Sequence, residues 1–429
     1  MSAPDWNLKS PGLPGLPERL LLLSALLIIG ASGNLLALWG YNYAGEGGNP
    51  LEKIHPSTLT LLLAWLSFLA YREGGARLMA LLRQPGILIG LCCSVLAIVY
   101  AQLVLGQPLS GVVVSWLSPV LLLALLLQLN ESQKRRLEYL LYALMLVNTV
   151  MGVIEFAQGS ALVPPVLLDY TGFGQELDMA EWGEWRASGL FGHPLAATLG
   201  CGIFVVTLYT RLCFRRLSLV QGFTLLHCLA VMPLFGGRTS IFATLLFVLL
   251  LSSGRVLLEV WGRPRNRIDP LKVMLSLLLL LLLALYAYQA GMFDPLLERM
   301  QDDNGSGRTR LAAWEIFLNT PLSEILLGDF RGMLVQRQVI FGTVYGIEVF
   351  WLGMLLIYGL VGSALLFASG WRVLRAMAVR VSPLTWWPAA FFLFAISSGV
   401  GLTVKSTSFS TLLLVMLLLR DAPLPRRGR

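Results

Sequence analysis

Charged residues are scarce in this chain: they make up 13% of its 429 residues, while hydrophobic residues make up 56%. Apolar runs long enough to cross a bilayer, about 20 residues each, recur from Leu20 to Leu419. This composition argues against the two or three soluble domains that the length alone would allow. The sequence therefore predicts an all-α polytopic membrane protein, with residues 1–429 forming a single integral membrane domain.

Cysteine is also scarce, and no cysteine lies in a long polar loop. The five cysteines are Cys92, Cys93, Cys201, Cys213 and Cys228. Their positions within or beside apolar runs give neither a disulfide framework nor the spacing of metal ligands. We expect them to be small core residues.

Motifs for common cofactors are absent as well. The chain contains no Walker loop, dinucleotide fingerprint or zinc signature. Its net charge of +8 does not indicate a nucleic-acid partner, because most basic residues stand in short loops beside apolar runs, where they orient a membrane protein. We expect no cofactor, no metal and no nucleic-acid partner.

About twelve segments are predicted to span the membrane. They are 20–39, 57–71, 86–105, 112–129, 137–157, 189–210, 218–233, 239–253, 271–289, 346–368, 384–400 and 407–419. The seventh and eighth are separated only by residues 234–238, so a tight hairpin and a partly re-entrant one both fit the pattern.

The distribution of Lys and Arg predicts the orientation of these spans. If the N-terminus lies inside, the inner segments carry 23 of the 32 basic residues, and every short inner loop is basic. Inner loops of membrane proteins are enriched in Lys and Arg. We therefore expect both termini on the cytoplasmic side and both long polar loops, 158–188 and 291–345, on the outer side.

The second long loop is expected to contain short helices. An amphipathic helix is predicted over residues 308–319, and Pro321 is expected to end it. Its predicted apolar set is Leu311, Trp314, Ile316 and Phe317.

Arg186 and His193 stand where the chain enters the sixth predicted span from outside. A guanidinium grips phosphate oxygens with a planar fork, and Gly189 and Gly192 allow close backbone approach or unusual dihedral angles. Pro194 suits a first helical turn. An alternative reading has Arg186 reaching lipid headgroups and His193 capping a helix.

Arg238, Arg308 and Arg310 are further candidates for binding an anion on the outer side. Arg238 follows two glycines between two spans, where the N-terminal amides of the next helix add positive potential. Arg308, Arg310 and Trp314 share the predicted outer helix and suit contacts with phosphate or sugar. An interfacial anchor for Arg238, and a helix resting on headgroups for the other three, are the alternatives.

Glu348 is the candidate catalytic carboxylate. It falls at the outer mouth of the tenth predicted span, where a carboxylate is costly unless it is paired or used. A general base at this position would accept a proton from a sugar hydroxyl. The alternative is an ion pair with one of the outer arginines.

These motifs, in this order, resemble the O-antigen ligase and polymerase superfamily, over roughly residues 140–370. The matching residues are Arg186 with Gly189 to Pro194, then Arg238-Thr239, Arg310, Trp314, Pro321, Gly328 and Tyr358 to Gly362. Resembling ligases open the late span with a His that is usually followed by Asn, whereas Glu348-Val349 stands there in this chain. Both a ligase and a polysaccharide polymerase therefore stay open.

The resemblance implies a fold related to the GT-C glycosyltransferases and an active face on the periplasmic side of the bacterial inner membrane. It implies metal-independent, inverting transfer of a glycan from an undecaprenyl-pyrophosphate donor to a glycan or lipid A-core acceptor, in surface polysaccharide or lipopolysaccharide biosynthesis. Arg186 and Arg238, with Arg308 or Arg310, would hold the pyrophosphate; Glu348 would act on the acceptor hydroxyl, and His193 would support the site.

A transporter or flippase for lipid-linked saccharides is the competing function. It would need polar residues near the middle of the bilayer and interrupted helices in two related halves. Asn34, Asn148 and Glu155 are the closest candidates for such polar residues.

The predicted orientation is open to a direct labelling test. In intact spheroplasts, an impermeant thiol reagent is expected to label Ser306→Cys, because the second long loop faces outward. Ser132→Cys should stay protected on the inner side. Labelling of Ser132→Cys with protection of Ser306→Cys would contradict the orientation and the outer location of the arginines.

Overall fold

The computed structural model describes residues 12–43, 47–164, 186–260, 285, 288–289, 291, 306–343 and 346–420. Every regular element in these residues is helical, as predicted. Six helical segments are long and apolar enough to cross a membrane. The chain is thus an α-helical protein with the helices of a membrane protein.

The structure gives the helices the following bounds, with 3-10 and π elements marked η. They are α1 Gly15–Gly30, α2 Gly33–Leu38, η1 Pro50–Lys53, α3 Pro56–Leu69, α4 Gly74–Leu82, α5 Pro85–Leu103, α6 Leu109–Val112, η2 Val113–Leu117, α7 Ser118–Leu126, α8 Glu131–Gln158, η3 Gly189–Phe191, α9 Pro194–Phe214, α10 Leu219–Phe235, α11 Arg238–Val260, α14 Ser306–Leu318, α15 Leu322–Leu327, α16 Leu334–Ile340, α17 Phe350–Arg380, η4 Pro383–Thr385, α18 Trp386–Ile396, α19 Ser408–Met416 and η5 Leu417–Leu419.

Six of the predicted spans coincide with the long apolar segments. These are α5, the continuous segment Leu109–Leu126, α8, α9, α11 and α17. Five others coincide with shorter helices, and the ninth predicted span, 271–289, lies almost wholly outside the described residues. Length and apolarity therefore support six spans in the described part of the chain, and the number twelve is not confirmed.

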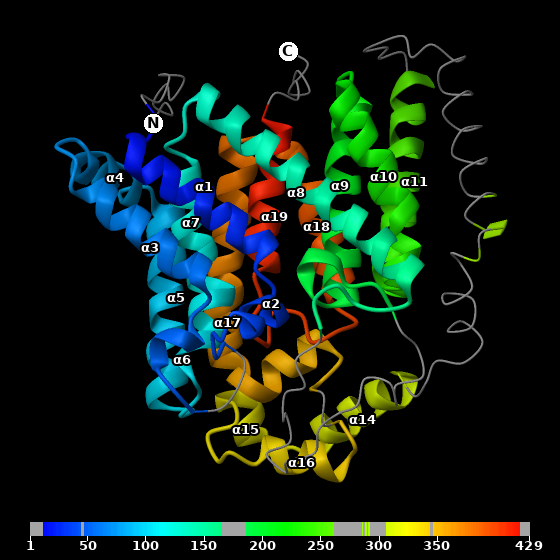
Figure 1. Cartoon of the computed structure of the whole chain (residues 1–429). Helices are drawn as coiled ribbons and strands as arrows, with labels where there is room; N and C mark the ends of the chain where they lie inside the picture. The colour runs from blue at the N-terminus through cyan, green and yellow to red at the C-terminus, as the bar shows by residue number, and fades with distance from the viewer. Residues whose placement is uncertain are drawn as a thin grey trace.

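The first predicted span, 20–39, is wrong as a single helix. α1 ends at Gly30, and α2 begins at Gly33 after Ser32, whose side chain accepts a hydrogen bond from the Leu35 amide. The apolar run continues through this break, so hydrophobicity alone gives no sign of it. The break directs α2 across the helix bundle (Figure 1).

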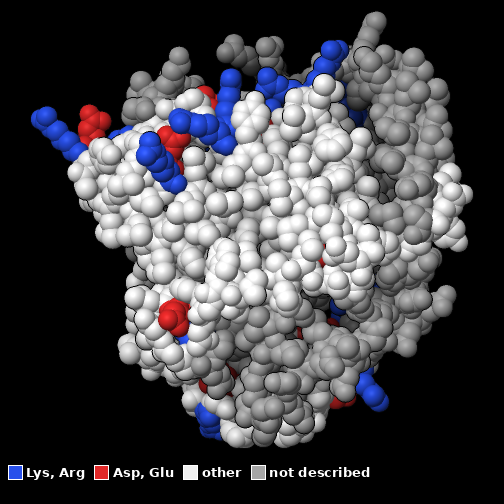
Figure 2. Space-filling model, viewed as in Figure 1, with Lys and Arg blue, Asp and Glu red and all other residues white. Residues whose placement is uncertain are grey.

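Charged side chains lie toward two opposite ends of the molecule. The described chain begins and finishes at the same end, here called the termini end, and α14, α15 and α16 lie at the opposite one, the loop end (Figure 1). Figure 2 shows Lys and Arg side chains gathered at the termini end, above a band with almost no charge. An uncharged band between two polar ends is what a bilayer requires of the surface that it covers.

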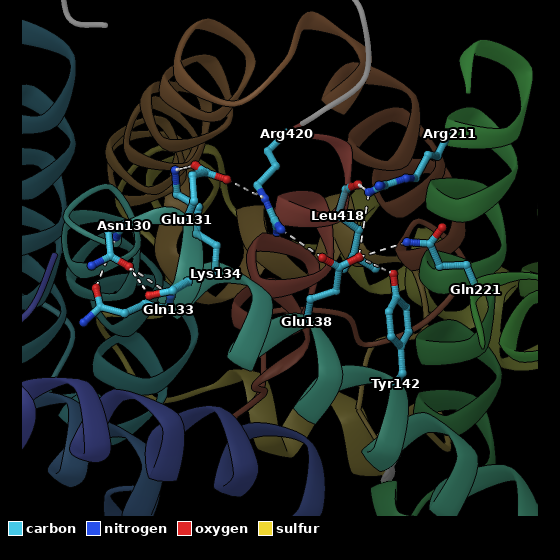
Figure 3. A network of polar contacts seen from close by, with 11 residues as sticks. Asn130, Glu131, Gln133, Lys134, Glu138, Tyr142, Arg211, Gln221, Leu418 and Arg420 are labelled. Atoms are coloured by element: carbon cyan, nitrogen blue, oxygen red, sulfur yellow. Dashed lines mark hydrogen bonds and ion pairs between the residues drawn. The ribbon is translucent and has the colours of Figure 1, made fainter. Parts of the chain in front are cut away.

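A network of buried charges joins three helices and the chain end after α19 at the termini end (Figure 3). Glu138 of α8 accepts hydrogen bonds from Tyr142 at 2.7 Å, from Gln221 of α10 at 3.0 Å and from Arg420 at 2.9 Å. Arg211 of α9 lies 3.9 Å from the same carboxylate. Because breaking a buried ion pair leaves an uncompensated charge, this network fixes how α8, α9, α10 and the chain end after α19 meet.

The helices of the loop end dock onto α17 through two glycines, Gly328 and Gly359. Gly359 interrupts α17 with φ 66° and ψ 179°, a conformation that is open essentially to glycine alone. A β-carbon there would stand 2.2 Å from the amide nitrogen of Gly328, which follows α15. The Asp329 amide donates to the Ile357 carbonyl at 3.2 Å. The tenth predicted span, 346–368, is therefore corrected to a helix bent by this contact.

Replacing Gly359 with alanine is expected to destabilise the protein. The Gly359→Ala variant places a β-carbon against the backbone of Gly328. It also holds an alanine at backbone angles that only glycine adopts readily, which lowers the free energy of unfolding by about 1–3 kcal/mol or more. Thermal unfolding in a mild detergent measures the loss. Gly222→Ala is the matched control, because a β-carbon at this helical glycine of α10 meets nothing within 4 Å. Equal unfolding midpoints for the two variants would contradict the docking role.

Candidate functional site

The structure places all seven predicted site residues toward the loop end. They come from four segments far apart in sequence: Arg186 and His193 precede α9, Arg238 opens α11, Arg308, Arg310 and Trp314 belong to α14, and Glu348 precedes α17. The following contacts determine how these segments meet.

Residues 188–190 are held by two buried polar side chains of α8. The Glu155 carboxylate accepts hydrogen bonds from the amides of Ser188 at 2.7 Å and Gly189 at 2.9 Å. Asn148 accepts one from the Leu190 amide at 2.9 Å. Glu155 and Asn148 have no exposed surface. The chain that carries Arg186 is therefore anchored to the interior of the helix bundle.

Gly189 and Gly192 are needed for close contacts, as predicted. Both have positive φ, 53° and 64°. A β-carbon at Gly189 would stand 2.5 Å from Asn148 Oδ1, and one at Gly192 would stand 2.6 Å from Ser32 Oγ. Asn34 of α2 donates to the Gly192 carbonyl at 2.8 Å. The break between α1 and α2 thus positions two side chains against this turn.

His193 caps α9, which begins at Pro194. Its Nδ1 accepts a hydrogen bond from the Leu195 amide at 3.2 Å. An accepting Nδ1 carries no proton, so the imidazole that caps this helix is neutral. The side chain is exposed to solvent. Protein atoms near the ring, and then the positive charge of Arg186, lower the pKa of His193.

Arg186 lies against the turn that leads to Arg238. α10 ends at Phe235 and α11 starts at Arg238, so the turn between these two helices is tight. The Arg186 Cδ is 3.0 Å from where a β-carbon of Gly236 would stand. The Gly237 amide donates to Thr198 of α9 at 3.1 Å. Two arginines from different segments therefore flank one glycine turn at the N-terminus of α11, an end that favours anions.

The helix predicted over 308–319 is confirmed as α14, Ser306–Leu318. Ile316 is buried together with Ala312 and Ala313. Leu311 is 67% exposed and Trp314 is 50% exposed. The predicted apolar set is therefore divided: Ile316 packs against the protein, and Leu311 and Trp314 lie on its surface.

Glu348 joins α14 to the start of α17. Thr309, between Arg308 and Arg310, donates to the Glu348 carboxylate at 3.1 Å. A cavity of about 420 Å³ opens beside this contact. It is lined by Arg308, Thr309, Ile340, Phe341 and Gly342.

The loop between α18 and α19 connects the Glu348 segment to the Arg238 turn. The Phe350 amide donates to the Ser397 carbonyl at 3.3 Å, and Ser398 donates to Thr239 at 2.7 Å. The structure thereby brings the segments of Arg186, Arg238 and Glu348 into one connected region.

Several residues that shape this region were not among the predicted site residues. Asn34, Asn148 and Glu155 were predicted only as the polar residues that a transporter would use, whereas all three hold the 188–192 segment. The position of Thr309 between two candidate arginines could have marked it as a site residue. Nothing in the sequence around Ser398 marks that residue. Within the part of the chain that the structure describes, no cluster of three His, Cys, Asp or Glu side chains is arranged to hold a metal.

The Glu155→Gln variant is expected to unfold more easily than the native protein. The carboxylate accepts amide hydrogen bonds on both oxygens, including one from Leu162 at 3.1 Å. A glutamine replaces one acceptor by a donor, which leaves buried amides unsatisfied at a cost of about 1–3 kcal/mol. Thermal unfolding in detergent measures this loss. Glu315→Gln, on the exposed surface of α14, is the control that should unfold like the native protein; an equally stable Glu155→Gln would contradict the anchoring role.

Comparison with known proteins adds no relative: no family model, curated protein or solved structure matches this chain.

Proposed function

We propose that this protein is a membrane glycosyltransferase that moves a glycan from an undecaprenyl-pyrophosphate donor to an acceptor hydroxyl. The observation that carries the proposal is the approach of Arg186 to the glycine turn that precedes Arg238. Two guanidinium groups at the N-terminus of a membrane helix suit an anion that is attached to a lipid. The order of motifs along the chain, which resembles O-antigen ligases and polymerases, supports the same function.

The donor pyrophosphate would bind between Arg186 and Arg238. Both side chains are partly buried, where the interaction with a phosphate is stronger than in open water. The planar fork of each guanidinium binds two phosphate oxygens at once. The lipid tail of the donor would extend from this position into the bilayer.

Transfer would proceed in one displacement with inversion at the sugar carbon. The acceptor oxygen forms a bond to the anomeric carbon as the bond from that carbon to the pyrophosphate oxygen breaks. The departing pyrophosphate takes the electron pair, and the two arginines stabilise the charge that builds up on it. Glu348 takes the proton of the acceptor hydroxyl.

The acceptor would approach from the side of α14. Thr309 orients the Glu348 carboxylate, and the cavity beside it, lined in part by Arg308, offers space for a glycan. Arg310 and Trp314 belong to the same helix. Ligases and polymerases differ in the acceptor, so the proposal includes both.

The loop end would face the periplasm, with the basic termini end in the cytoplasm. Lipid-linked glycans for the cell surface are used on the periplasmic face of the inner membrane, which agrees with this orientation. Transport is the less favoured function, since the three polar residues it would need hold backbone groups of residues 188–192.

Two variants test the proposal by separating donor binding from transfer. The double variant Arg186→Lys and Arg238→Lys keeps both positive charges but loses the two guanidinium groups that bind phosphate oxygens in pairs. Donor binding and transfer should therefore fall at least about tenfold. Glu348→Gln should bind polyprenyl-pyrophosphate donor normally and fail to transfer. Donor binding is measured in detergent with purified protein, and transfer by the appearance of glycosylated acceptor.

Arg331→Lys is the control, because this exposed outer arginine lies outside the proposed site. Its binding and transfer should match the native protein. Full transfer by the double arginine variant would contradict the donor site. A folded Glu348→Gln variant with native transfer rates would contradict the role of the carboxylate.

A further inference from the structure

A cavity at the termini end lies between the last turns of α17 and the start of α18. Its volume is about 390 Å³, and it is lined by Trp371, Arg375, Ala378, Val379, Pro383 and Trp386. The rings of Trp371 and Trp386 lie 4.9 Å apart at an angle of 35°. The walls are thus apolar, and Arg375 supplies the one charge among the lining residues.

Arg375 projects from a different side of α17 than its basic neighbours. Arg380 donates to Gln84 beside α5 at 2.6 Å, and the Cβ of Arg372 lies 3.6 Å from where a β-carbon of Gly90 in α5 would stand. Both therefore face α5, whereas Arg375 faces the cavity and α18. No acidic residue lines the cavity among those that the structure describes.

The position of the cavity along α17 matches the headgroup level of a bilayer. Residues 360–380, after the break at Gly359, rise about 30 Å at roughly 1.5 Å per residue, which is close to the thickness of the hydrocarbon core. Arg375 stands five residues before the end of this helix. Trp371, which is 53% exposed, and Val379, which is 73% exposed, flank Arg375 along the helix.

We propose that this cavity binds one anionic phospholipid of the leaflet at the termini end. The lipid phosphate contacts Arg375, and an acyl chain lies against Trp371, Val379 and Trp386. Basic pockets between membrane helices bind anionic headgroups in this way. A soluble phosphate would leave the apolar walls unused, and a neutral lipid would leave the guanidinium without a matching charge. The site lies at the opposite end from Arg186 and Arg238 and does not depend on the proposed transfer reaction.

Thermal unfolding of the purified protein in neutral detergent tests the site. A lipid that binds the folded state raises the unfolding midpoint in a saturable way. Phosphatidylglycerol is expected to do so, whereas phosphatidylcholine and soluble sn-glycerol 3-phosphate are not. Arg375→Gln should weaken the apparent affinity for phosphatidylglycerol about fivefold, the effect of one basic residue near an anionic lipid.

Arg216→Gln is the matched control, since this exposed arginine lies at the termini end outside the cavity. Its response to phosphatidylglycerol should equal that of the native protein. Val379→Trp, which fills the cavity and keeps Arg375, should lose the response. Equal stabilisation by phosphatidylcholine, a full effect of sn-glycerol 3-phosphate, or a native response in both Arg375→Gln and Val379→Trp would overturn the proposal.

Discussion

The buried carboxylate of Glu155 is the constraint on which the geometry of the loop end depends. A charge inside an apolar helix bundle is costly unless its oxygens accept hydrogen bonds. Glu155 meets this requirement with the amides of Leu162, Ser188 and Gly189, which lie on both sides of the first long loop. Both ends of that loop are therefore fixed to α8, and Arg186, two residues before Ser188, is fixed with them.

Charged residues serve different purposes at the two ends of the molecule. At the termini end, Glu138, Arg211 and Arg420 are almost fully buried and interact with one another. Such pairs add little to stability compared with apolar packing, but they are costly to break, so they define how the helices meet. At the loop end, Arg186 and Arg238 are partly exposed beside glycines. Gly236 has no side chain, so Arg186 can pack directly against this turn.

The sequence predicted features that depend on local chemistry and missed those that depend on distant partners. Hydrophobic runs predicted the helical class, and Pro194 and the glycines predicted the start of α9 and its close contacts. The break at Gly359 was missed because it depends on Gly328, a contact that no pattern within either segment reveals. The sequence did not decide which side of α14 the protein covers, because the periodicity of a helix does not name the partner of its apolar face. The sequence identified Asn148 and Glu155 as polar residues within a predicted span. It did not predict that they bind the amides of residues 188–190.

The same contacts explain why the proposed donor and acceptor groups belong to different parts of the fold. Arg238 opens a membrane helix, and Arg186 is anchored to another through Glu155. Glu348 instead belongs to a segment that the helices of the loop end hold. Thr309 of α14 contacts Glu348, and Gly328 contacts Gly359 further along α17. A reaction between a lipid-anchored donor and a separate acceptor needs one group fixed at the membrane and another fixed above it. The loop between α18 and α19, which contacts both segments, is where these two parts of the protein meet.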